Sequence, residues 1–372
     1  MQVPILCVSD VLRRSGISTL VFAFAAMLLA SVSEVQARAS CPAASPNDSV
    51  SDDAALNACL AAGGTVDLSS GSPGYIVQTG LYIVGPVVLD GGPTGARLLA
   101  HAGLVGPILR AGYNYWGSPL TPAPQNFTIR RILFDGNRSS RSSSLCNPPA
   151  DNRYGYNVMI NGSGLVLDQV HSFQALCGTG MEVTGSSYQI RNSAFNNNRG
   201  DGLTAVTCTN SVIEDNAVWD NEDVGLAVGT GDGTCSVARN LVAQYTVAAH
   251  AGLLVGFHSG ANVVNNTVYS NFNLMKVGLM VGGHIWNGGS NTFGAGNIQS
   301  NHIEGAVVLA AIDGISSGTF QNNTGANRQG TAYFSNCPSF IDVYSVNVAH
   351  IGTASVQPGY VNRNLDACFP PP

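Results

Sequence analysis

The feature that most constrains the fold of this chain is a five-residue segment that recurs along its middle. Each copy has a glycine, then Leu or Met, a variable residue, and Val or Ala. The copies are Thr179–Val183, Asp201–Ala205, Val224–Val228, Ala251–Val255 and Val277–Val281, with Val307–Ala310 as a sixth that lacks the glycine. The anchor positions are 180, 202, 225, 252, 278 and 307, so the period lies between 22 and 29 residues.

A second unit with alternating apolar residues and asparagine lies between the copies. Examples are Ile190–Asn196, Ile213–Trp219 and Val263–Tyr269. Alternation predicts short strands, and Asn or Gly between them predicts turns. So short a period cannot bury an apolar face alone, so neighbouring coils must stack. We therefore predict an all-β fold, a parallel β-helix or solenoid, with an apolar core and asparagine ladders along its axis.

Both ends of such a stack need a cap. Ser51-Asp52-Asp53 has the composition of a helix N-cap, the following residues 54–60 form an amphipathic pattern, and Gly63-Gly64 predicts the helix end. Thr65–Leu68 and Tyr75–Val77 are the first predicted strands. We divide the chain into a signal peptide (1–39), a capped β-helix (40–335) and a C-terminal capping tail (336–372).

The first 39 residues have the pattern of an export signal. Arg13 and Arg14 precede an apolar run, Ile17–Ala30, and Ala37-Arg38-Ala39 is a small-x-small cleavage site. We expect cleavage after Ala39, with Ala37 as the alternative. No second apolar run is long enough for a membrane helix. We therefore expect a secreted or periplasmic protein with no membrane association after cleavage.

Cysteine usage agrees with an oxidising compartment. Nine cysteines become eight when Cys7 leaves with the signal, and no pair has the close spacing of a zinc site. Pairing of sequence neighbours predicts Cys41–Cys59, Cys146–Cys177, Cys208–Cys235 and Cys337–Cys368.

Charge is scarce in this sequence. Charged residues make up 10% of the chain, the net charge is −6, and Lys276 is the only lysine. Nucleic-acid binding requires clustered Lys and Arg, so this composition argues against it.

The opening helix with Gly-Gly, the Phe134-Asp135-Gly136-Asn137-Arg138 turn and the Gly-Leu-x-Val coils resemble the pectate-lyase-like β-helix superfamily, over about residues 50–335. The resemblance implies a right-handed helix. It implies little about chemistry, because that superfamily includes lyases, glycoside hydrolases, epimerases, esterases and non-catalytic proteins.

Residues at equal offset from the anchor lie about 4.8 Å apart along the axis of a stacked β-helix. Two residues before the anchor, or next to that position, charged side chains gather on consecutive coils. They are Arg199, Asp201, Glu222, Asp223, His250 and Lys276. Such a set can supply an acid, a base and a charge stabiliser. The alternative is an ordinary solvated turn.

A second column lies six residues after the anchor and includes His258, His284 and Asp313. Two histidines and an aspartate on consecutive coils could act as acid and base or bind a divalent metal, and no other cofactor is indicated. They could equally be turn residues that share hydrogen bonds.

The outward face of the strands, two residues past the anchor, is polar at one end and apolar at the other. It runs Glu182, Thr204, Ala227, Leu254, Met280 and Leu309. The apolar end could contact a sugar or be covered by a loop or by a second subunit, which would make the protein a homo-oligomer. We take Leu254, Met280 and Glu222 as substrate-binding candidates. Trp116, Trp219 and Trp286 are candidates for sugar stacking, with Trp286 preferred because it follows His284 by two residues.

Comparison with the polygalacturonase family is the most direct. By resemblance, Asp201 matches the first catalytic aspartate and Asp223 the first of the aspartate pair. The second of that pair is Val224 here, the histidine is shifted by one at His250, and the Arg-x-Lys positions are empty. In a lyase, His250 or Lys276 would be the base, assisted by Arg199.

These observations predict a secreted enzyme that cleaves glycosidic bonds of a polysaccharide or oligosaccharide, by lyase or hydrolase chemistry. Two alternatives remain open. One is a non-catalytic β-helix that binds glycans or assembles at a surface, and the other is an enzyme of this fold with a smaller, less polar substrate.

Overall fold

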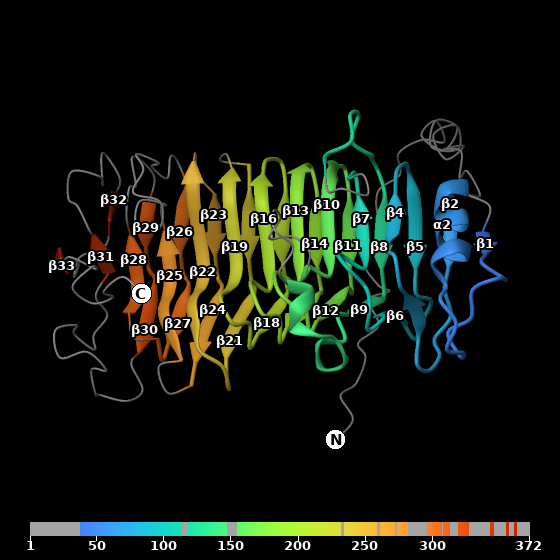
Figure 1. Ribbon diagram of the computed structural model, residues 1–372. Helices are drawn as coiled ribbons and strands as arrows, with labels where there is room; N and C mark the ends of the chain where they lie inside the picture. Colours follow the sequence, from blue (N-terminus) through green and yellow to red (C-terminus); the bar gives the residue numbers. More distant parts are fainter. Residues whose placement is uncertain are drawn as a thin grey trace, which may run out of the picture. The chain divides into compact units, whose positions relative to one another are not determined.

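The computed structural model describes residues 38–113, 118–146, 155–231, 234–258, 261–271, 274–281, 296–306, 308–312 and 319–326, with short strands at 343–345, 355–356 and 361–362. From β2 to β30, each coil contributes one strand to sheet A, one to sheet B and one to sheet C (Figure 1). All ladders between strands are parallel, so the fold is the predicted all-β solenoid.

Sheet A consists of β1 (Arg38–Ser40), β2 (Gly64–Asp67), β5 (Val87–Asp90), β8 (Thr128–Arg130), β11 (Val166–Asp168), β14 (Gln189–Arg191), β17 (Val212–Glu214), β20 (Ser236–Ala238), β23 (Asn262–Val264), β26 (Asn297–Gln299), β29 (Thr319–Gln321) and β32 (Ser355–Val356). Sheet B consists of β3 (Tyr75–Val77), β6 (Ala96–Ala100), β9 (Ile132–Asp135), β12 (His171–Phe173), β15 (Ala194–Asn196), β18 (Ala217–Trp219), β21 (Leu241–Gln244), β24 (Thr267–Ser270), β27 (His302–Glu304) and β30 (Thr324–Ala326). Sheet C consists of β4 (Leu81–Ile83), β7 (Leu109–Ala111), β10 (Val158–Ser163), β13 (Met181–Ser186), β16 (Leu203–Cys208), β19 (Val224–Gly231), β22 (Ala249–His258), β25 (Met275–Val281), β28 (Val308–Ile312), β31 (Val343–Ser345) and β33 (Val361–Asn362).

The recurring segment forms the sheet C strands, and its glycine is required by close packing. A Cβ on Gly202 would lie 2.6 Å from the carbonyl oxygen of Gly225 and from a methyl group of Val218. The residue after each glycine points inward and is fully buried. This core column is Met181, Leu203, Leu226, Leu253 and Leu279. Burial of such a side chain stabilises the fold by about 1.5–3 kcal/mol.

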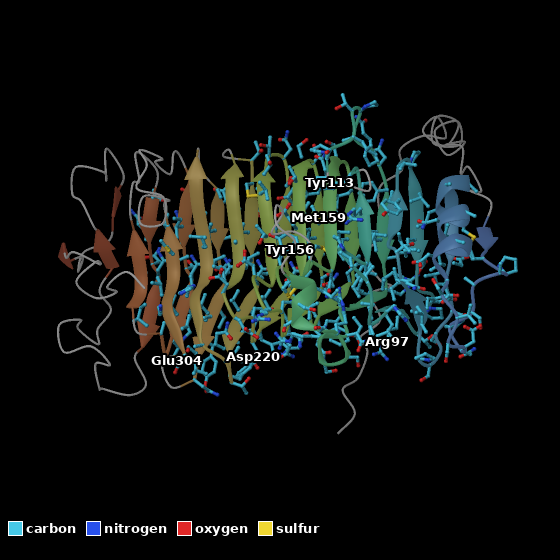
Figure 2. The ribbon with its side chains drawn as sticks, in the orientation of Figure 1. Arg97, Tyr113, Tyr156, Met159, Asp220 and Glu304 are labelled. Carbon is cyan, nitrogen blue, oxygen red and sulfur yellow. A yellow bond between two sulfur atoms is a disulfide. The ribbon has the colours of Figure 1, made fainter. Side chains whose placement is uncertain are left out.

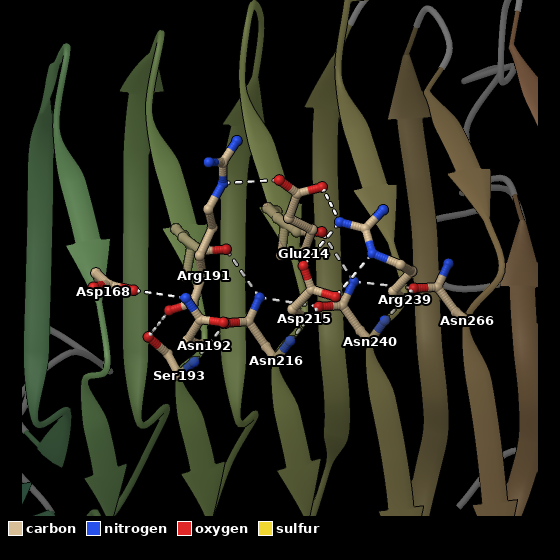
Figure 3. A network of polar contacts seen from close by, with 12 residues as sticks. Asp168, Arg191, Asn192, Ser193, Glu214, Asp215, Asn216, Arg239, Asn240 and Asn266 are labelled. Atoms are coloured by element: carbon tan, nitrogen blue, oxygen red, sulfur yellow. Dashed lines mark hydrogen bonds and ion pairs between the residues drawn. The ribbon is translucent and has the colours of Figure 1, made fainter. Parts of the chain in front are cut away.

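An asparagine ladder runs along the turn between sheets A and B, as predicted (Figure 3). The side-chain amide of Asn216 donates to Oδ1 of Asn240 at 3.0 Å, and Asn240 donates in the same way to Asn266. Asn301 and Asn323 continue the ladder. Each amide is buried but hydrogen-bonded, so the polar column carries no unpaired-group penalty.

The predicted capping helix is α2 (Asp53–Ala62), and it ends at Gly63, whose φ of 72° is the left-handed conformation that glycine adopts readily. Leu56 and Leu60 of this helix are buried on the first coil. Asp52 does not cap the helix with its side chain, which corrects the prediction. Its carboxylate instead accepts hydrogen bonds from the main-chain N–H groups of Ser45 and Ile76.

Further side-chain bonds tie α2 to the first coil. Asp53 accepts from the main-chain N–H groups of Gln78 and Thr79. Asn57 accepts from Tyr82 N–H at 2.9 Å and donates to the carbonyl of Gly80 at 3.0 Å. The helix therefore occupies main-chain groups that a further coil would otherwise use.

Three of the four predicted disulfides are confirmed: Cys41–Cys59, Cys146–Cys177 and Cys208–Cys235. The fourth, Cys337–Cys368, lies outside the described residues, as does nearly all of the predicted signal peptide. Arg38–Ser40, at the predicted cleavage site, pairs with β2 as the outermost strand of sheet A. In the described part of the chain, no helix is long and apolar enough to cross a membrane.

One detail of register differs from the predicted repeat. Met280 pairs with Ala311 and Leu279 with Ala310, so Leu309, and not Val307, takes the glycine position of the sixth coil. The short strands β31, β32 and β33 add to sheets A and C within the predicted C-terminal tail, whose boundary stays a prediction.

Candidate functional site

The candidate site lies where the turns from sheet B enter the strands of sheet C. Val224 pairs with Ala251, and Ala251 with Val277, so the preceding residues Asp223, His250 and Lys276 lie on three consecutive coils. The structure therefore brings together this part of the column that equal offsets predicted.

Asp223 and His250 form a hydrogen-bonded pair across two coils. Nδ1 of His250 lies 2.7 Å from Oδ1 of Asp223, and the main-chain N–H of His250 donates to the carbonyl of Asp223 at 2.8 Å. Both side chains are close to half exposed, at 43% and 50%. A carboxylate bonded to one imidazole nitrogen fixes the orientation of the ring.

Asp201 lies one coil before Asp223 and differs from it in environment. Its Oδ2 accepts a hydrogen bond from Thr204 Oγ1 at 2.6 Å, and its Oδ1 accepts from the main-chain N–H of Val224 at 3.1 Å. Burial raises the pKa of Asp201 to about 6, and the negative charges of Asp223 and Glu182 add to the rise, against the lowering effect of the two hydrogen bonds. A carboxyl with such a pKa keeps a proton available near neutral pH, as a general acid must.

Two exposed cationic side chains lie near these turns into sheet C. Lys276 on β25 and Arg199 in the turn before β16 are both exposed. Glu222 is paired with Arg138, whose Nη1 lies 2.6 Å from its carboxylate. Arg138 opens the short 3-10 helix η1 (Arg138–Ser140), which η2 (Ser143–Cys146) follows in the same long connection between β9 and β10.

Three of these interactions were not predicted from the sequence. Thr204 and Glu182 were predicted to lie on the outward face of the strands. The hydrogen bond from Thr204 to Asp201 and the effect of the Glu182 charge on the pKa of Asp201 were not predicted. Arg138 is 84 residues from Glu222, and nothing in the sequence of its connection indicates that contact.

The second predicted column does not keep its register. A shift between Val228 and Thr230 pairs His258 with Thr230, although equal offsets had placed His258 beside Gly231. One extra residue in β22 accounts for the shift. His284, Trp286 and Asp313 lie outside the described residues, as does Trp116. Within the described ranges, no group of three or more His, Cys, Asp or Glu side chains could hold a metal ion.

The outward face of sheet C is accessible only in part. Glu182 and Thr204 are partly exposed. Ala227, Leu254 and Met280 are only 7%, 8% and 1% exposed, and on the preceding coils Met159 is buried in the same way (Figure 2). Ala311 replaces Leu309 in this column, because Leu309 is part of the core. This burial counts against the predicted role of Leu254 and Met280 as substrate contacts, and that role stays a prediction.

Comparison with known families decides the hand of the solenoid. Residues 125–298 match the family model described as right handed beta helix region. The chain is a right-handed parallel β-helix. The predicted resemblance is thereby confirmed at the level of fold.

Solved structures similar to this β-helix include three polysaccharide-acting proteins. The A-module of mannuronan C-5 epimerase AlgE6 from Azotobacter vinelandii is 16% identical, with a TM-score of 0.49 over 85% of this chain and 78% of that one. Pectate lyase Pel9A is 14% identical, with a TM-score of 0.43 over 89% and 79%. The family 28 exopolygalacturonase of Yersinia enterocolitica is 9% identical, with a TM-score of 0.39 over 88% and 79%. Among curated proteins, none matches this sequence. Similarities this distant carry no argument about activity.

Proposed function

We propose that this β-helix is a carbohydrate-active enzyme that hydrolyses glycosidic bonds of a polysaccharide at the edge formed by Asp201, Asp223 and His250. The observation that carries the proposal is the contrast between two neighbouring carboxyl groups. Burial raises the pKa of Asp201 to about 6, whereas Asp223 is half exposed and bonded to a histidine. Glycoside hydrolysis needs such a pair, with one carboxyl protonated and the other charged.

In this mechanism, Asp201 donates its proton to the oxygen of the leaving sugar. Thr204 and the N–H of Val224 hold its carboxyl group in place. Asp223, oriented by His250, accepts a proton from the attacking water. Because Asp201 must be protonated to act, activity should fall as the pH rises through about 6.

The two exposed cationic side chains near the turns into sheet C support a second candidate, a lyase. Exposed Lys276 and Arg199 would neutralise a uronate carboxylate, and His250 or Lys276 would remove the proton from the adjacent carbon. Of the non-catalytic alternatives, assembly at a surface is the less well supported, because Ala227, Leu254 and Met280 are buried within the chain and offer little apolar surface for it.

We also propose that the protein works outside the cytoplasm. Three disulfides fit an extracellular or periplasmic location, because reducing conditions oppose such bonds in the cytoplasm of most organisms.

The deciding experiment is a screen of the purified protein against neutral and uronate polysaccharides, recording new reducing ends together with the ultraviolet absorbance of unsaturated uronates. Reducing ends without absorbance, lost in Asp201→Asn and Asp223→Asn, are expected. Asp215→Asn, an exposed carboxyl on the turn between sheets A and B, is the matched control. A rise of both signals would establish the lyase instead. Full activity of Asp201→Asn would overturn the site.

A further inference from the structure

The outward face of sheet B carries a row of aromatic side chains that the proposed hydrolysis does not use. The central residues of its strands point into the core, and the flanking residues point outward. Phe173, Trp219 and Tyr269 occupy the same outward position on β12, β18 and β24, and all three are partly exposed.

Register gives this row a fixed spacing. Phe173 pairs with Asn196, Asn196 with Trp219, Trp219 with Ala243, and Ala243 with Tyr269. The aromatic residues therefore occupy every second strand, which sets successive rings about 9.6 Å apart along the axis. The residues between them, Asn196 and Ala243, are only 6% and 1% exposed, so the aromatic side chains are the ones that present surface to a ligand.

Neighbouring rings widen the row. The ring of His171 lies 4.7 Å from Phe173 and 6.0 Å from Trp219, measured between centroids, and so bridges the first two members. Tyr245, which is 41% exposed, lies 5.7 Å from Tyr269. Packing between rings fixes their orientation before any ligand binds.

The row lies on a neutral stretch of the sheet. Charged side chains occur at its two ends: Arg97 is paired with Asp135, and Glu304 lies 3.8 Å from His302 (Figure 2). Between these ends, the outward positions of β12 to β24 carry no Lys, Arg, Asp or Glu. A neutral ligand complements this stretch, whereas a polyuronate would gain no ion pair there.

We propose that this row binds a neutral, β-1,4-linked polysaccharide, separately from the acidic edge. An extended β-1,4-linked chain turns the same face of every second sugar to one side, and its two-sugar repeat is close to the distance between the aromatic residues. Phe173, Trp219 and Tyr269 then each stack on one sugar of successive repeats. The row lies at the end of the sheet B strands, and the turn into sheet C begins directly after it, at Asp220 on the coil of Trp219. A chain bound to the row therefore runs alongside the turns that carry Asp201 and Asp223.

The test is a depletion assay with microcrystalline cellulose and insoluble β-1,4-mannan, using full-length protein that carries Asp201→Asn so that no polymer is consumed. We expect binding to at least one of the two, and a loss of about tenfold or more in Trp219→Ala, which corresponds to the loss of one stacking contact. Phe173→Ala and Tyr269→Ala should each weaken binding. Leu241→Ala, which removes a 39% exposed side chain from the same face outside the row, should stay within about twofold of the parent.

Trp219→Tyr keeps a ring at this position and should retain most of the binding, so it tests the proposal even if Trp219→Ala misfolds. Absence of binding to both polymers would overturn the proposal, as would equal binding by the parent and by properly folded Trp219→Ala. Because the assay measures binding of a protein without Asp201, hydrolysis can fail while the row is confirmed, and the reverse also holds.

Discussion

The turn between sheets A and B and the turn into sheet C both stack polar residues on consecutive coils, yet they differ in how charge is compensated. On the first turn, Arg239 bonds to Glu214 and Asp215, and Arg191 bonds to Glu214 (Figure 3). The side-chain amides of Asn216, Asn240 and Asn266 on this turn hydrogen-bond to one another. On the second turn, the carboxyls of Asp201 and Asp223 lie close together, and no guanidinium of the described residues bonds to either. The first turn is held together by hydrogen bonds and ion pairs between its stacked residues, whereas on the second turn burial of Asp201, with the nearby charges of Asp223 and Glu182, raises the pKa of its carboxyl group.

The difference between the two turns is tested most directly at Asp201. Asp201→Asn keeps the size of the side chain but removes the dissociable proton, so turnover on a confirmed polysaccharide should fall by about 10²–10⁴-fold. Asp215→Asn, on the compensated turn, should leave turnover unchanged. Initial rates of both variants at one pH would measure the difference, and equal rates would show that the two turns do not differ in function.

The stability of the protein should depend on the side-chain amides of the turn between sheets A and B. Asn240→Ala removes the acceptor of the Asn216 main-chain N–H and the amide that donates to the Ile213 carbonyl in a buried column, so the free energy of unfolding should fall by about 1–3 kcal/mol. Gln189→Ala, at an exposed position of the neighbouring strand β14, is the control. Denaturant unfolding followed by circular dichroism would check both, and an equal loss in the two variants would contradict a special role for the ladder.

The two turns should also respond oppositely to pH. Because burial raises the pKa of Asp201 to about 6 from an ordinary 3.8, the folded protein binds this proton more tightly than the unfolded chain, and stability from this group falls as the pH rises between those values. Arg239 lowers the pKa of Asp215, so that group gains stability as the pH rises.

Melting temperatures of the parent and of Asp201→Asn, compared at pH values below and above this window, isolate the first effect. The variant should become the relatively more stable protein as the pH rises. A constant difference would mean that the pKa of Asp201 is not raised.

The smallest effect is expected at Arg239. Its two ion pairs, to Glu214 and Asp215, lie on an exposed surface, where solvent and salt weaken them, so Arg239→Ala should leave the melting temperature nearly unchanged at physiological ionic strength. A clear loss would mean that the surface ion pairs stabilise the turn together with the ladder. The same measurement at low salt would sharpen the result, because any contribution should appear there first.

Much of the fold followed from the sequence because the repeat is strict where packing is tight. A side chain at Gly202 or Gly225 would collide with the next coil, so glycine and the inward Leu mark the register directly. The sixth coil was misplaced by two residues because it lacks that glycine, and the register shift before His258 leaves no signal in composition.

The candidate site was predictable only as far as strand register determines it. Counting from the anchor placed Asp223, His250 and Lys276 on consecutive coils. It could not show that Thr204 bonds to Asp201, because that contact depends on side-chain rotamers, nor that Arg138 reaches Glu222, because long connections have no fixed register. The aromatic row could not be predicted either: Trp219 was noted as a candidate for stacking, but its alignment with Phe173 and Tyr269 depends on the pairing register of five strands.

The hydrogen bonds of α2 have a consequence for how this protein behaves at high concentration. Any solenoid exposes a strand edge at its end, and such an edge can template the addition of another molecule. Asp53 and Asn57 occupy the N–H groups of Gln78, Thr79 and Tyr82, so α2 blocks the addition of a strand where the first coil enters sheet C. End-to-end association of two molecules through this edge would require α2 to be displaced.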